Sequence, residues 1–111
     1  MSALDSLSPN QFGFHIASMR DREGILKEGL KPQDNPDYTP GVYAMNTKEG
    51  LEHYVGDSRR NSDIYKVHVP IHEQESDPNM PGAFFTKKAV PPEHIEKVGH
   101  ATSSGKLKWH K

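Results

Sequence analysis

The sequence predicts a single small α+β domain, on three observations. Its 111 residues can form one hydrophobic core and leave no room for a second. Only 32% of the residues are apolar, so this core is small and much of the chain forms loops. Patterns typical of strands and helices follow in the order strand, helix, strand, helix and three strands, which favours an α+β arrangement.

A strand and a helix are predicted first. Residues 12–16 form an apolar and aromatic run that fits a strand. Ser18 is followed by Asp21 at the spacing of a capping box, so we expect a helix over about 21–28. Gly29 would relieve a left-handed turn at the end of this helix, and Pro32 would block its continuation.

A second strand and helix follow a loop over 33–40 that contains two prolines. Residues 41–45 are predicted to form the strand. Asn46, with Glu49 three residues later, is expected to open a helix over about 47–55. The predicted buried face of this helix carries Leu51, Tyr54 and Val55.

Three further strands are predicted in the second half of the chain. Residues 64–69 alternate between apolar and polar side chains from Tyr65 onward, 83–86 form another strand, and a turn leads into a last strand over about 95–98. The segment 72–82 is almost devoid of apolar residues, so we expect a long mobile loop. The C-terminal segment 99–111 is expected to be mobile unless its tryptophan docks. The five strands are predicted to form two small facing sheets.

Charge and composition exclude several functions. The chain has 14 Lys and Arg against 15 Asp and Glu, which argues against a duplex-binding protein held by phosphate contacts. The absence of cysteine excludes disulfides, zinc ribbons and thiol nucleophiles. The first residues lack a basic start and a long apolar run, and no stretch approaches membrane-spanning length, so we expect a cytoplasmic protein.

His15, Ser18, Tyr43 and Tyr54 form the most informative pattern. An imidazole and a hydroxyl close together suit the hydroxyls of a ribose, and two tyrosines on neighbouring elements suit a flat heterocycle. Each residue also has a structural interpretation. His15 fits a buried histidine bonded to a carbonyl, the tyrosines fit core aromatics, and Ser18 fits a helix cap.

The order of these motifs resembles the ADP-ribosyltransferase fold over roughly residues 12–98. The run from Gly41-Val42-Tyr43 to Tyr54 is similar to the branch of poly-ADP-ribose polymerases and diphtheria toxin. The segments 25–32 and 85–95 are similar to the NAD-binding lobe of RNA 2′-phosphotransferases. The resemblance implies one domain over 12–98 with a split β-sheet core and two short helices, flanked by an N-terminal segment 1–11 and the tail 99–111.

The resemblance also implies that NAD is a substrate. His15 would bond the ribose, Tyr43 would form part of the pocket, and Tyr54 would stack on the nicotinamide. Ser18 is a further candidate for binding NAD, because its hydroxyl suits the ribose hydroxyls. The transition state resembles an oxocarbenium ion, so a carboxylate near the ribose should stabilise it.

That carboxylate is missing from its usual place. In the family, the catalytic glutamate lies near the start of the strand that corresponds to 83–85, and here residues 79–82 contain no acid. Glu75 has the spacing seen in arginine-modifying relatives, which makes it the candidate catalytic residue; Glu73 and Glu75 also fit ordinary solvated loop acids. Arg59 and Arg60 are the arginines nearest the expected cleft, although a doublet in a turn is usually solvated.

Two functions follow. The first is an NAD-dependent ADP-ribosyltransferase that modifies a macromolecule, a protein rather than a nucleic acid, with the loop 72–82 choosing the target. The second is a catalytically inactive binding or interaction module, an inhibitor or an accessory subunit, which the missing glutamate favours. A metal site is not expected, because His53, His68 and His72 lack a convincing third ligand in their spacing.

Overall fold

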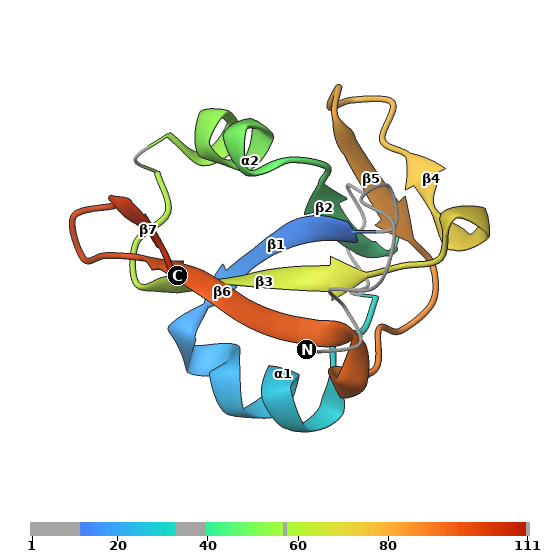
Figure 1. The fold of residues 1–111 in the computed structure, drawn as a ribbon, viewed down its shortest axis with the longest axis horizontal. Coiled ribbons are helices and arrows are strands. Elements are labelled where there is room, and N and C mark those ends of the chain that lie inside the picture. Colours follow the sequence, from blue (N-terminus) through green and yellow to red (C-terminus); the bar gives the residue numbers. More distant parts are fainter. Residues whose placement is uncertain (1–11, 33–39, 57, 111) are drawn as a thin grey trace.

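The computed structural model describes residues 12–32, 40–56 and 58–110. Within these residues the chain forms an α+β domain with a seven-stranded antiparallel sheet and two short helices (Figure 1). The helices are α1 (Arg22–Glu28) and α2 (Lys48–Val55), and the 3-10 turns are η3 (Met19–Asp21), η4 (Ile71–Glu73) and η5 (Pro92–His94). The strands are β1 (Phe12–Ser18), β2 (Val42–Met45), β3 (Ser62–His68), β4 (Glu75–Ser76), β5 (Ala83–Thr86), β6 (Ile95–Ala101) and β7 (Leu107–Trp109).

The strands follow the order β4, β5, β2, β1, β3, β6, β7 across one sheet, so the prediction of two facing sheets is wrong. β1 pairs with β3 along its whole length, whereas it pairs with β2 at Phe14 and Met45. This short β1–β2 junction joins two halves whose strands run in different directions, with β5 steeply inclined to β3 in Figure 1. The sheet is therefore continuous, but narrow at its centre.

The two helices cover opposite faces of the sheet. Ile64 and Tyr65 are neighbours on β3 and belong to different core clusters, because successive side chains of a strand point to opposite faces. The cluster under α1 consists of Ile25, Leu30, Val42, Ala44, Tyr65, Val67, Val69, Phe84 and Val90. The cluster under α2 consists of Ile16, Met45, Leu51, Val55, Ile64 and Ala101.

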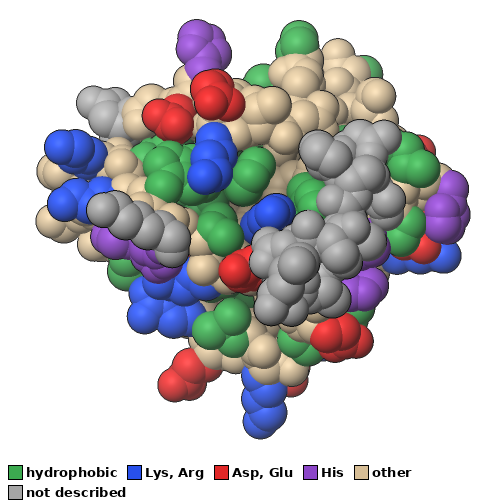
Figure 2. All heavy atoms as spheres, in the orientation of Figure 1, with side chains coloured by type: hydrophobic (Ala, Val, Ile, Leu, Met, Phe, Trp, Pro, Cys, Tyr) green, Lys and Arg blue, Asp and Glu red, His purple; other side chains and the backbone are tan. Residues whose placement is uncertain are grey.

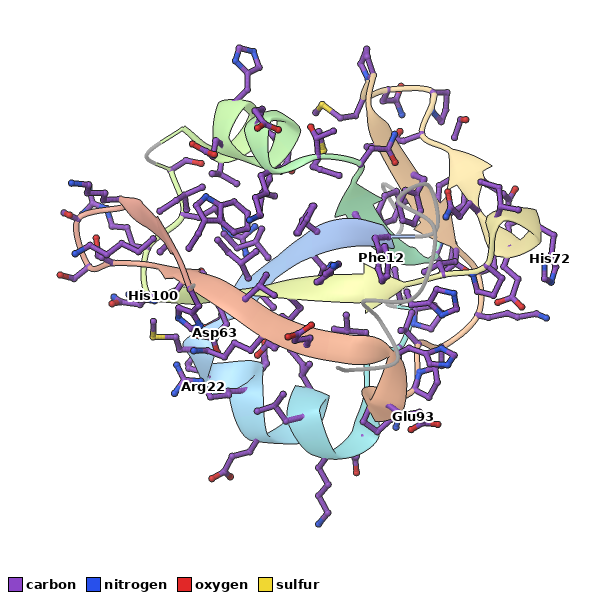
Figure 3. All side chains as sticks on the ribbon, in the orientation of Figure 1. Phe12, Arg22, Asp63, His72, Glu93 and His100 are labelled. Carbon is purple, nitrogen blue, oxygen red and sulfur yellow. The ribbon has the colours of Figure 1, made fainter. Side chains whose placement is uncertain are left out.

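The helix predicted over 21–28 is confirmed as α1, with a different start. Ser18 caps the preceding turn η3, since its Oγ accepts the N–H of Arg20 at 3.3 Å. Gly29 ends α1 with a φ of 85°, a left-handed conformation that favours glycine. Arg22 donates to both carboxylate oxygens of Asp63 on β3, at 2.7 and 2.9 Å, which fixes α1 to the sheet (Figure 3).

The second predicted helix is confirmed as α2, but its cap and its buried face differ from the prediction. Thr47 rather than Asn46 caps it, accepting the N–H of Gly50 at 2.9 Å. Leu51 and Val55 are buried as expected, whereas Tyr54 is 51% exposed. Tyr54 is therefore not part of the hydrophobic core, although the apolar pattern of the helix places it on the buried face.

Two segments that the sequence predicts to be mobile contain secondary structure. The segment 72–82 contains part of η4 and the short strand β4, so it is not a structureless loop. The last predicted strand extends to Ala101, and the expected mobile tail contains β7. Trp109 on β7 packs edge-on against Phe14, with ring centroids 5.6 Å apart. The predicted loop 33–40 lies outside the described residues except for Pro40, and the segment 1–11 lies outside them entirely.

Candidate functional site

A pocket of about 570 Å³ lies at the β1–β2 junction, bounded by α2 and by the turn between β4 and β5. This volume is in the range that small-molecule sites occupy. Its apolar wall consists of Phe14, Ile16, Ala44, Met45, Leu51, Met80 and Ala83. Its other lining residues can hydrogen bond or carry charge: His15, Tyr43, Tyr54, Arg59, Asp77 and Asn79. Figure 2 shows hydrophobic side chains gathered beneath α2 with Lys and Arg side chains beside them.

The fold fixes the orientation of His15. Its Nδ1 lies 2.7 Å from the carbonyl oxygen of Tyr43, so the ring spans the gap where β1 and β2 diverge. A carbonyl oxygen can only accept, so Nδ1 carries the proton. In the neutral ring Nε2 is then an acceptor, the state suited to a ligand hydroxyl.

Burial keeps this imidazole neutral. Desolvation lowers the pKa of His15 below 6.5, the hydrogen bond to Tyr43 opposes this shift, and the positive charge of Arg59 adds to it. His15 is therefore a neutral hydrogen-bonding group at neutral pH.

Aromatic rings line the pocket from two elements. Tyr43 on β2 stacks on Phe85 of β5, with ring centroids 5.1 Å apart and planes 25° from parallel. Tyr54 projects from α2 and leaves about half of its surface to solvent. A rigid ring on one side and a partly exposed ring on the other suit a planar heterocycle.

Arg59 and Asp77 give the pocket opposite charges. Arg59 Nη2 lies 3.5 Å from the carbonyl oxygen of Ile16, a long contact. Asp77 accepts the N–H of Asn79 through Oδ1 at 2.9 Å, which fixes the carboxylate in the turn before β5. Among the described residues, Asp77 is the only carboxylate that lines the pocket.

The structure therefore brings together three of the five residues that the sequence singled out. His15, Tyr43 and Tyr54 share the pocket, whereas Ser18 and Glu75 do not line it. Ser18 is engaged in capping η3. Glu75 lies on β4, where its Oε2 is 3.6 Å from Nζ of Lys87, so the acid predicted to be catalytic lies outside the pocket.

Among the described residues, Asp77 rather than Glu75 is the carboxylate that lines the pocket. The signal that marks it is the Asp-Pro-Asn turn between β4 and β5, because an aspartate that bonds the backbone two residues later fixes a tight turn. Topology alone then brings this turn to the pocket. The expected absence of a metal site stays a prediction. No group of three His, Cys, Asp or Glu side chains suited to a metal occurs in the described part of the chain, and His72 projects outward in Figure 3.

Comparison with models of protein families and with curated protein sequences finds no match to this chain. Among the described residues, no helix is both long and apolar enough to cross a membrane.

Proposed function

We propose that the pocket binds NAD as a substrate and that the protein transfers its ADP-ribose unit to a macromolecular target. One observation carries the proposal. His15, Tyr43 and Tyr54 come from three different elements and line the same pocket, with His15 held as a neutral acceptor. A ribose hydroxyl donates to Nε2 of His15, and the nicotinamide ring packs against Tyr54.

Asp77 supplies the charge that the reaction needs. When the bond between ribose C1′ and the nicotinamide nitrogen breaks, its electron pair neutralises the pyridinium and positive charge develops on the ribose. The carboxylate of Asp77 stabilises that charge. The target nucleophile then bonds to C1′ and loses its proton to Asp77 or to water, which completes the transfer.

The target approaches past the turn between β4 and β5. This turn carries both Asp77 and Asn79, so a target bound on it has its nucleophile near the acid. A protein target fits the chain better than a nucleic acid does, because 14 basic residues are balanced by 15 acidic ones.

Calorimetric titration with NAD and measurement of released nicotinamide test the proposal. Tyr54→Ala should weaken NAD binding roughly fivefold, since ring stacking contributes about 1 kcal/mol. Asp77→Asn should leave binding nearly unchanged and lower turnover, because the carboxylate acts chiefly in the transition state. Glu75→Gln is the matched control and should change neither. If millimolar NAD gives neither binding heat nor nicotinamide, the proposal fails.

A specific observation favours a second function, an inactive module that binds NAD without cleaving it. Ala83 lies at the start of β5, the neighbourhood of the glutamate in the enzymes that the sequence resembles, and it lines the pocket. In this case the unaltered protein binds NAD and releases no nicotinamide. Ala83→Glu, checked for folding by circular dichroism, should then introduce NAD hydrolysis. Release by the unaltered protein would exclude this second function.

A further inference from the structure

The guanidinium group of Arg59 makes few hydrogen bonds within the described part of the chain. A guanidinium carries five N–H donors, and its contact with the Ile16 carbonyl is long, at 3.5 Å. In the described part of the chain, no ion pair involves Arg59, in contrast to Arg22, which is bound to Asp63. An arginine beside an apolar wall without a carboxylate partner is suited to a ligand anion.

The place of Arg59 relative to His15 restricts which anion it can bind. Arg59 contacts the residue directly after His15 and lies close enough for its charge to act on the imidazole. In the proposed complex His15 bonds the ribose that carries nicotinamide. The anionic group nearest to that ribose is its own 5′-phosphate, whereas the adenosine half of NAD lies farther along the dinucleotide.

We infer that Arg59 binds the 5′-phosphate of the nicotinamide ribose, so that the pocket selects a nicotinamide nucleotide over the nucleoside. The inference rests on the proposed function and deepens it, because it assigns the ligand class to the nicotinamide half of NAD. Arg59 is a specificity residue in this arrangement. Two parallel N–H donors of the guanidinium match two phosphate oxygens, whereas the nucleoside has no phosphate for them to bind.

Arg60 provides a matched control. It is the next residue along the same turn, it is exposed, and it does not line the pocket. Its backbone carbonyl accepts the hydroxyl of Ser62 at 3.1 Å, a bond that a side-chain substitution leaves in place. Arg60→Ala removes the same charge from the molecule as Arg59→Ala, so a difference between the two variants reports on position rather than on net charge.

The experiment measures the affinities of NAD, nicotinamide mononucleotide and nicotinamide riboside for the unaltered protein and for both variants. The unaltered protein and Arg60→Ala should bind the mononucleotide roughly tenfold more tightly than the riboside. Arg59→Ala should bind the two ligands equally. Arg59→Lys, which keeps the charge and is a second variant in case the alanine protein misfolds, should retain part of the preference.

Two results would overturn the inference separately from the proposed function. If NAD binds and Arg59→Ala keeps the preference for the mononucleotide, Arg59 does not bind this phosphate, while the NAD pocket stands. If NAD binds but the riboside binds as tightly as the mononucleotide in the unaltered protein, the 5′-phosphate does not contribute to binding in the pocket. If none of the three ligands binds, the proposed function and the inference fail together.

Discussion

At the scale of single residues, His15 shows how tertiary structure decides the chemistry of a side chain. The sequence predicted a histidine at the ribose but could not assign its ring nitrogens. The carbonyl of Tyr43 on another strand fixes the proton on Nδ1, so Nε2 is a hydrogen-bond acceptor in the neutral ring. Desolvation lowers the pKa of the ring, whereas the hydrogen bond that orients it opposes this shift, so orientation and protonation state have separate causes.

NAD affinity should depend on pH through His15. Its pKa is lowered from 6.5, so the ring is neutral above pH 6.5, where affinity should be constant. As the pH falls below 6.5 through the lowered pKa, protonation turns Nε2 from an acceptor into a donor and affinity should fall severalfold. Titrations between pH 5 and 8 at fixed ionic strength measure this.

His15→Gln is the control for this titration. The amide places a group that does not titrate near the position of Nε2, so this variant should bind NAD more weakly but with a nearly constant affinity over the same pH range. A parallel pH dependence in both proteins would assign the titration to another group.

At the scale of elements, the pairing of Arg22 with Asp63 connects α1 to the sheet. Asp63 is fully buried on β3, accepts two N–H donors of Arg22 and the hydroxyl of Tyr65, and has Lys97 Nζ at 3.8 Å. These bonds lower the pKa of Asp63, with the Arg22 hydrogen bonds as the largest cause. Burial and the Asp63 charge raise the pKa of Tyr65 well above its usual value, so its hydroxyl remains a donor.

Asp63→Asn should lower the free energy of unfolding by roughly 1–3 kcal/mol at pH 7, because hydrogen bonds to a charged group are lost. The folded-state pKa of Asp63 is depressed, so its contribution is complete above the unfolded value of 3.8 and is lost as the pH falls through the folded value. Urea denaturation at pH 7 and at lower pH should show the difference between the proteins shrinking. Glu23→Gln, which removes an exposed carboxylate on α1, should change stability little; an equal loss in both variants would contradict this assignment.

The elements differ in how far the sequence could predict them. β3 alternates and α1 has a glycine at its end, and both are local signals that the structure confirms. β7 has three residues, pairs with β6 and packs Trp109 on Phe14, a contact between distant parts of the chain. β4 is a two-residue strand held by its ladder with β5, so its own residues carry no strand pattern. Local sequence patterns do not predict short strands such as these, because contacts between distant parts of the chain form them.

At the scale of the whole molecule, the candidate site arises where the two halves of the sheet meet. The sequence could nominate His15, Tyr43 and Tyr54, because their order resembles a known family. It could not place Asp77 in preference to Glu75, because Glu75 lies on β4 and Asp77, only two residues later, lies in the turn that lines the pocket. The pocket itself depends on the narrow β1–β2 junction, which no local pattern predicts.

Gly13 has no side chain, which allows the two halves of the sheet to pack closely at this junction. A Cβ at this position would lie 2.5 and 2.6 Å from ring atoms of Phe84 on β5, and 2.8 Å from the Cβ of Ala44 on β2. Phe84 and Ala44 belong to one half of the sheet and Gly13 to the other, so the close approach packs the halves against each other.

Gly13→Ala should therefore lower the free energy of unfolding by roughly 1–3 kcal/mol, the usual cost of overpacking a core. Gly24→Ala is the matched substitution: a Cβ there meets nothing within 4 Å, and Gly24 lies inside α1. Alanine at this helical position should stabilise the protein by about 0.5–1 kcal/mol. Denaturant titration of the two variants should thus give shifts of opposite sign. Equal or greater stability of Gly13→Ala would mean that Phe84 can move away without loss, and that the two halves of the sheet are not locked together at this contact.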